Sequence, residues 1–217
     1  MKKPIPPQSL DGLYEVGIAT TEKELKQIYK LRKQVYSDEL NYFDCDSDYL
    51  SDDLDAYSTN FHIKYEGQIV GTARFTSELD GELELSQDID WKQYVRKDRV
   101  YCEITRLIFS PEHRNWLGSC VMFKFINDYC IKKKINAIVI GVKLSPIWKR
   151  YYQAIGFKVV KNTLFKVNTF SSSPEYEVGY RYFDNKTTNT KFINTLKHKL
   201  KTPEDYYKVK EYNMDLI

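Results

Sequence analysis

The stretch INAIVIGVKLSPIWKRYYQAIGFKVV, residues 135–160, decides the fold class of this protein. Its first part, 135–142, is an almost continuous apolar run, which is typical of a strand buried on both faces of a sheet. Ser145 and Pro146 then open a helix, because serine caps helix N-termini and proline suits the first helical position. Gly156 ends that helix before the next strand. The stretch therefore predicts a sheet with a helix packed against it.

The rest of the chain predicts further strands and helices around this centre. Residues 21–24, Thr-Glu-Lys-Glu, form a capping box that opens a helix running to about Leu40. Glu66-Gly67 separates two β-branched and aromatic runs, which is typical of a hairpin. The other predicted strands are 13–19, 60–65, 68–77, 100–110, 157–160, 164–170 and 177–183, and the other predicted helices are 85–97, one opened by Pro111, and 190–200.

The composition is that of one globular domain. The 217 residues are 42% apolar and 15% aromatic, which is enough for a sizeable core and a lined pocket. We find no internal repeat and no clear linker, so we expect a single domain over residues 1–217. Residues 41–58 are polar and rich in aspartate, and we interpret them as a long functional loop. We expect residues 184–217 to form a C-terminal helical extension.

Charge, cysteines and hydropathy exclude several classes of protein. The net charge of +3 is far below that of a dedicated nucleic-acid binder. The four cysteines include no CxxC pair, so we expect free and mostly buried thiols, and we predict no metal site. Prolines interrupt the basic N-terminus, and no uncharged apolar run approaches about eighteen residues. We therefore expect a cytoplasmic protein without a membrane span.

The second half of the chain resembles the GNAT acyltransferases. The predicted strand–helix–strand–helix order over residues 100–157 matches that family, and Tyr-x-x-x-Gly-Phe beginning at Tyr152 is the sharpest match. The resemblance implies an α+β, GNAT-like fold with a central twisted mixed sheet flanked by helices. It also implies that the turn holding Arg114, Gly118 and Ser119 binds the phosphates of the acyl donor at a helix N-terminus. The glycine spacing of this turn is incomplete, which favours a carrier other than free coenzyme A.

The first half resembles a narrower branch, the acyl-homoserine-lactone autoinducer synthases and the related N-acyl amino acid synthases. The shared pattern runs in the same order from residue 25 to about residue 160. Its members are Arg32, Tyr36 and Tyr42, then Asp53 and Asp55 in the acidic loop, then Gly71 to Arg74, then Glu103 to Arg106. The match does not choose between the two families. Ser58 stands where an autoinducer synthase usually has aspartate, which puts the use of S-adenosylmethionine in doubt.

This resemblance assigns roles that the residue types can perform. Glu103 is the candidate base that deprotonates the acceptor amine, Tyr152 protonates the departing thiolate, and Arg106 is the third candidate catalytic residue. We expect Asp53 and Asp55 to attract the acceptor's ammonium, and Arg74 and Arg106 to orient a carboxylate. Arg32, Tyr36 and Tyr42 complete the predicted substrate site, with Arg32 paired to an acid of the loop or to Glu103.

Two features of this assignment stay open. Glu103 and Arg106 point to opposite faces of a straight strand, so they share a site only if a β-bulge separates them. Their alternative role is a structural ion-pair network with Arg32 or Arg74, which is about as favoured as direct catalysis.

The sequence allows three functions. The favoured one is transfer of a medium- or long-chain acyl group from acyl carrier protein or coenzyme A to a small amine, with no permanently bound cofactor. The alternatives are an ordinary acetyl-coenzyme-A-dependent acetyltransferase and a non-catalytic thioester-binding module. Acyl carrier proteins are acidic, so Arg114, Lys149 and Arg150 are the predicted docking residues. The oligomeric state is left open.

Overall fold

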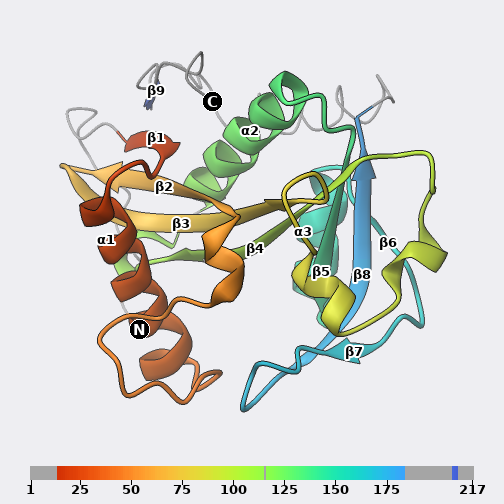
Figure 1. Cartoon of the computed structure of the whole chain (residues 1–217), viewed down its shortest axis with the longest axis horizontal. Helices are drawn as coiled ribbons and strands as arrows, with labels where there is room; N and C mark the ends of the chain where they lie inside the picture. Colours follow the sequence, from red (N-terminus) through yellow and green to blue (C-terminus); the bar gives the residue numbers. More distant parts are fainter. Residues whose placement is uncertain (1–13, 115, 184–206, 210–217) are drawn as a thin grey trace.

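A single mixed sheet organises the computed structural model, which describes residues 14–114, 116–183 and 207–209 (Figure 1). The strand order is β6-β8-β5-β4-β3-β2-β1-β9, with β7 paired to β8. The β4–β5 and β1–β9 pairs are parallel and the others are antiparallel. The strands are β1 (Tyr14–Ile18), β2 (Thr59–Tyr65), β3 (Gln68–Ser77), β4 (Tyr101–Phe109), β5 (Ala137–Lys143), β6 (Lys158–Val159), β7 (Phe165–Lys166), β8 (Glu175–Tyr182) and β9 (Tyr207–Val209).

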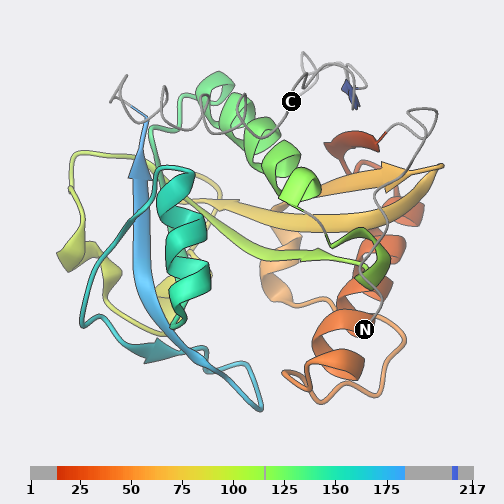
Figure 2. The same ribbon diagram turned by 180° about the vertical axis from the view of Figure 1, so that it is seen from behind.

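Helices cover both faces of the sheet. The helix α1 (Glu22–Arg32) packs on β3 and β4, whereas α2 (Trp116–Lys132) packs on β1 and β2, and α3 (Pro146–Ala154) on β5 and β6. Figure 2 shows α2 and α3 in front of the sheet and α1 behind it. The remaining helical segments are the π-helix η1 (Lys33–Glu39) and the 3₁₀ helices η2 (Asp53–Ala56), η3 (Glu84–Gln87), η4 (Trp91–Tyr94) and η5 (Pro111–His113).

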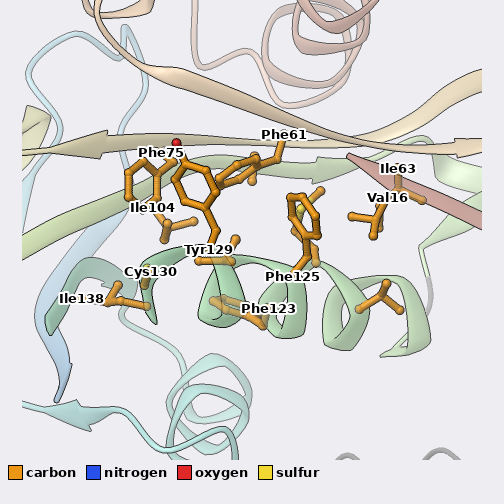
Figure 3. Packing of buried hydrophobic residues seen from close by; sticks show 14 of the residues in the cluster. Val16, Phe61, Ile63, Phe75, Ile104, Phe123, Phe125, Tyr129, Cys130 and Ile138 are labelled. Carbon is orange, nitrogen blue, oxygen red and sulfur yellow. The ribbon is translucent and has the colours of Figure 1, made fainter. Parts of the chain in front are cut away.

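Aromatic side chains fill the core between α2 and the sheet (Figure 3). Tyr129 of α2 packs edge-on against Phe61 of β2 and Phe75 of β3, with both ring centroids 5.1 Å away. Phe125, one turn earlier, makes a similar contact with Phe61 at 5.4 Å. The i, i+4 spacing of Phe125 and Tyr129 places both rings on one helix face. This packing fixes α2 on the side of the sheet opposite α1.

Several local predictions are confirmed. The capping box at residues 21–24 forms, and Pro146 is the first residue of α3. The hairpin turns at Glu66 and Gly67, whose φ angles of 50° and 79° suit the two-residue turn that joins twisted strands. Gly156 adopts φ 98° just after α3, as a terminating glycine does.

Other local predictions are wrong. Pro111 does not open α2; it begins the short helix η5, and α2 starts at Trp116. Residues 85–97 do not form one helix, because η3 and η4 are separated by residues 88–90. Trp91, 1% exposed, packs edge-on against Tyr101 there, so burial of one large ring sets the local backbone. Strand β7 is also much shorter than the predicted 164–170.

The predicted C-terminal helix, residues 190–200, lies outside the described residues. Of the predicted extension 184–217, only Tyr207–Val209 is described, and it is a strand parallel to β1. Cys102 and Cys130 are free and buried, with 3.6 Å between their sulfur atoms, whereas Cys45 is half-buried. Within the described part of the chain, every helix is too short or too polar to cross a bilayer.

The sheet opens between β4 and β5. The two strands pair only from Tyr101 to Glu103, which lie opposite Ala137 to Val139. Beyond that point β4 follows β3 while β5 follows β8, and Figure 1 shows the two halves of the sheet running in different directions. This separation creates the space that the candidate site uses.

A glycine permits the close contact of β3 and β4 beside this opening. A Cβ atom added at Gly71 would lie 2.5 Å from two ring carbons of Phe109, the residue opposite it. We predict that Gly71→Ala lowers the free energy of unfolding by roughly 1–3 kcal/mol, the usual cost of overpacking. Denaturant unfolding measures this. In a Phe109→Ala background the same change should cost clearly less; equal costs in both backgrounds would contradict the proposed clash.

Candidate active site

A β-bulge on β4 brings Glu103 and Arg106 into one cavity. Between the pairs Thr72–Ile108 and Arg74–Thr105, strand β3 has one residue and β4 has two. Arg106 is one of these two residues, and its φ of 52° lies in the left-handed region that non-glycine residues seldom adopt. Glu103 and Arg106 both line the cavity, and both bond to η3, Glu103 to the backbone N–H of Leu85 and Arg106 to Glu84. The bulge that the sequence required is confirmed.

Three buried arginines are held by three carboxylates beneath this bulge. Arg32 of α1, 1% exposed, binds both oxygens of Asp55 at 2.8 and 2.9 Å. Arg74 of β3, fully buried, binds Asp52 and donates to Glu84 at 2.7 Å. Arg106 completes the network with bonds of 3.0 Å to Asp52 and 2.7 Å to Glu84. The predicted partner of Arg32, an acid of the loop, is confirmed as Asp55.

The network is balanced in charge without Glu103. The three guanidinium groups carry three positive charges, and Asp52, Asp55 and Glu84 carry three negative ones. Glu103 is 3% exposed, and its Oε2 accepts a hydrogen bond of 3.1 Å from the backbone N–H of Leu85. Ionising Glu103 would therefore add a buried charge that no fourth arginine of the network neutralises.

This environment raises the pKa of Glu103 to about 8. Burial is the main cause, because it disfavours the charged form, and the negative charge of Glu84 adds to it. The Leu85 N–H, Arg74 and Arg106 act in the opposite direction and limit the shift. A carboxylate with a pKa near the working pH is well suited to accept and return a proton.

Aromatic rings form the wall above Arg106. The π-helix η1 places Tyr36 there, and π-helical turns are frequent at functional sites. The guanidinium of Arg106 lies 5.8 Å from the ring centroid of Tyr36, 5.3 Å from that of Phe43 and 5.6 Å from that of Phe170. Tyr42 stacks on Phe170 with 5.1 Å between centroids. These rings lie within cation–π distance of the Arg106 guanidinium and stabilise its positive charge.

A cavity of about 580 Å³ passes through the opening between β4 and β5. Consecutive residues of β4, Glu103 to Phe109, line it, so both faces of that strand contribute. On the α1 side the lining includes Tyr36 and Glu84, and on the α3 side it includes Trp148 and Tyr152. The cavity therefore joins the two faces of the sheet.

Tyr152 lies at the α3 side of this cavity. Its ring contacts those of Trp148, Phe123 and Phe157, with centroids 5.6 to 6.4 Å apart. Burial raises the pKa of Tyr152 above its usual value, so the hydroxyl remains protonated near neutral pH. A protonated phenol in this position can donate a hydrogen bond or a proton to a ligand in the cavity.

The predicted donor-binding turn contributes to the cavity wall. Arg114 and Ser119 line the cavity, and the buried Gly118 contacts Phe109 closely enough that a Cβ atom would lie 2.9 Å from the ring. Arg114 donates to the backbone oxygen of Phe109 at 3.0 Å and forms a two-pronged ion pair with Glu39. This arginine therefore links the end of η1 to the segment before α2.

Residues 27–166 match the family described as N-acyl amino acid synthase FeeM, which is well over half of the chain. The chain belongs to the FeeM family. This membership makes the protein an N-acyltransferase. A comparison with curated proteins finds no match.

Solved structures of related enzymes share the fold. FeeM itself, an N-acyl amino acid synthase from uncultured soil microbes, superposes with a TM-score of 0.69 at 13% identity, covering 88% of this chain and 100% of that one. The acyl-homoserine-lactone synthase LasI gives 0.62 at 15% identity, with 84% and 95% covered. The coenzyme-A-dependent synthase BjaI, solved with SAM and isopentyl-CoA, gives 0.66 at 13% identity, with 85% and 89% covered. The predicted GNAT-like fold is confirmed.

The structure brings most of the predicted site residues together. Glu103, Arg106, Tyr36, Tyr42, Tyr152, Arg114 and Ser119 line the cavity. Arg32, Arg74 and Asp55 lie behind it in the ion-pair network, and the geometry gives Asp55 a structural partner. Asp53 is exposed and does not line the cavity.

Sequence reasoning missed Asp52 and Glu84 in the network and Phe170 in the aromatic wall. Asp52 was visible as one of several loop acids, but only the loop conformation selects it over its neighbour Asp53. Glu84 had a weaker signal, since it is one of several acids after β3, with Glu78, Asp80 and Glu82 before it. Phe170 arrives from the other end of the chain, and the backbone of Ser171 bonds to Tyr42 O at 2.8 Å to hold it there.

Asp55 and Asp53 provide a matched test of the network. We predict that Asp55→Asn lowers the free energy of unfolding by about 3–5 kcal/mol, because it leaves Arg32 buried without its negative partner. Asp53→Asn removes the same charge from an exposed position and should change it by no more than about 0.5 kcal/mol. Denaturant unfolding of both variants measures the difference, and similar values for the two would disprove the structural role of Asp55.

Proposed function

We propose that this FeeM-family enzyme transfers a medium- or long-chain acyl group from the thioester of acyl carrier protein or coenzyme A to the amine of a small, amino-acid-like acceptor. The observation that carries the proposal is the cavity of about 580 Å³ through the sheet, with the buried Glu103 in its wall. The cavity is far larger than an acetyl group needs, and most of its lining side chains are apolar or aromatic.

The proposed reaction is a direct transfer. The neutral amine nitrogen attacks the thioester carbon, a C–N bond forms and the C–S bond breaks. Glu103 accepts the proton that the amine loses, directly or through a water molecule, and Tyr152 donates a proton to the departing thiolate. The guanidinium of Arg106 is already hydrogen-bonded to Asp52 and Glu84. In this proposal Arg106 therefore fixes the shape of the bulge and the position of Glu103.

The donor and the acceptor approach from different sides in this proposal. Tyr152 and the segment with Arg114 and Ser119 lie toward α2 and α3, which suits a phosphopantetheine arm entering beside a helix N-terminus. The aromatic wall and Glu103 lie toward α1, which suits the acceptor. BjaI, a structural neighbour solved with isopentyl-CoA, supports a thioester donor on this fold. Ser58 bonds to Thr76 at 2.7 Å and does not line the cavity, so it offers no support for S-adenosylmethionine.

Glu103→Gln tests the proposed base. We predict that turnover falls by roughly 10²- to 10⁴-fold, because the amide keeps the size but accepts no proton. The pH profile of wild-type kcat/KM should contain a rise through about pH 8, the pKa of Glu103, that Glu103→Gln lacks, whereas titration of the acceptor amine affects both enzymes alike. The control is Glu82→Gln, which changes an exposed glutamate two residues before Glu84 and should retain full activity. Wild-type turnover in purified Glu103→Gln would eliminate Glu103 as the base.

The same substitution should stabilise the fold at high pH. Because the pKa of Glu103 is raised on folding, the folded state holds its proton more tightly than the unfolded state does. Its stabilising contribution is therefore complete below the unfolded pKa and is lost as pH rises through about 8. The Tm of Glu103→Gln relative to wild type should increase across that interval, and a constant difference would contradict the assigned pKa.

A panel of thioester donors tests the proposed substrate class. Thiol release with an amine present should be faster from medium- or long-chain acyl thioesters than from acetyl thioesters. Comparing acyl carrier protein with coenzyme A thioesters of the same chain length identifies the preferred carrier. Preference for acetyl-coenzyme A would favour the ordinary acetyltransferase, and absence of thiol release with every donor would refute the proposal.

Arg150 serves as the docking variant for this panel. It is exposed on α3, beside the cavity-lining Tyr151, whereas Lys149 forms an ion pair with Glu177 at 2.5 Å. Arg150→Glu should slow use of acyl carrier protein most at low ionic strength, while a minimal acyl-pantetheine donor is used as before. Lys134→Glu, just beyond the far end of α2, is the control. An equal loss with both donors would rule out carrier docking at Arg150.

A further inference from the structure

Lys143 is a cation in the cavity wall that the proposed mechanism does not use. It is the last residue of β5, it is half-buried, and its side chain lines the cavity. Its Nζ donates to the hydroxyl of Tyr42 at 3.2 Å and lies 6.0 Å from the centroid of that ring. Tyr176, directly opposite on β8, lines the cavity as well.

Lys143 differs from the other cations of the cavity in having no carboxylate partner in the described part of the chain. Arg106 is bound by Asp52 and Glu84, and Arg114 is bound by Glu39. Among residues 14–114, 116–183 and 207–209, no acidic side chain forms an ion pair with Lys143. A half-buried ammonium in contact with a phenol and aromatic rings gains most from an anion that arrives with a ligand.

The position of Lys143 relative to Glu103 suits a small ligand. Val139 is level with Glu103 in the parallel pair, and Lys143 lies four residues farther along β5, roughly 13 Å at the rise of a strand. Gly141 lies between them on the same face of β5 and also lines the cavity. The rings of Phe165 and Tyr176 pack over Gly141, because a Cβ atom added there would lie 3.1 Å from the first and 3.6 Å from the second. The long side chain of Lys143 covers part of the separation and reaches past these rings to Tyr42.

We propose that Lys143 binds the carboxylate of the acceptor, so that the enzyme selects free amino acids over amines that lack a carboxylate. The proposal rests on the proposed acyl transfer. The acceptor's amine then faces Glu103 and its carboxylate faces Lys143, and the aromatic wall of Tyr36, Tyr42 and Phe170 contacts the part between or beside them. Arg74 and Arg106, the arginines expected from the sequence to orient a carboxylate, are already neutralised by the enzyme's own acids.

The test compares each amino acid with the amine that remains when its carboxylate is removed. Phenylalanine with phenethylamine and leucine with isoamylamine are two such pairs. For wild type, kcat/KM for the amino acid should exceed that for the amine. In Lys143→Met this ratio should fall by roughly 10- to 100-fold, the loss expected for a charge-assisted hydrogen bond. Lys143→Arg should keep most of the preference, and Lys166→Met, an exposed lysine of β7, should keep all of it.

The ratio separates this proposal from misfolding and from failure of the proposed function. Both acceptors are measured on one enzyme sample, so the fraction of folded protein cancels. If wild type transfers acyl groups to amines and Lys143→Met leaves the ratio unchanged, Lys143 does not bind the carboxylate. A larger KM for the donor with an unchanged ratio would place Lys143 on the acyl donor instead and overturn the proposal. If wild type acylates no amine, the proposed function fails, and this inference fails with it.

Discussion

Neutralising three buried arginines is the constraint on which the rest of the site depends. Each guanidinium is always charged, and burying it without a partner would cost several kcal/mol. The three partners come from two distant segments, the acidic loop and the start of η3. Both segments must therefore fold back onto β3 and β4 before the sheet can close over the charges. The loop between η1 and β2 is held both by the ion pairs of Asp52 and Asp55 and by apolar packing, because Leu54 is buried and Tyr42, Phe43 and Leu50 pack against Tyr36 and its neighbours.

The same constraint explains the chemistry of Glu103. A network with equal numbers of positive and negative charges leaves a fourth acid without compensation, and that acid retains its proton near neutral pH. Removing one of the three acids would change this balance as well as the stability of the fold. The proposed base and the scaffold are therefore not independent parts, because the negative charge of Glu84, a member of the network, helps to raise the pKa of Glu103.

Much of the fold and part of the site could be predicted from the sequence. The buried run 135–142, the helix from Pro146 and the hairpin at Glu66-Gly67 are decided by local chemistry, and the structure agrees with each. The bulge at Arg106 could be stated as a requirement but not located, because it follows from how β4 pairs with β3. The choice of Asp52 over Asp53 depends on one turn of η2, where adjacent acids point in different directions. Such selections follow from tertiary contacts, which composition and spacing do not encode.

The two ways in which this molecule is held together respond differently to heat. Water hydrates charged groups less favourably as temperature rises, so the desolvation cost of the buried ion network decreases on warming. The aromatic packing under α2 follows the hydrophobic effect, whose strength per unit of buried area levels off in the same range. On warming, the ion network of Arg32, Arg74 and Arg106 on the α1 side of the sheet therefore becomes more stabilising relative to the aromatic packing under α2. An organism that grows hot would lose little by keeping this costly arrangement, whereas one that lives in the cold would bear its full desolvation cost.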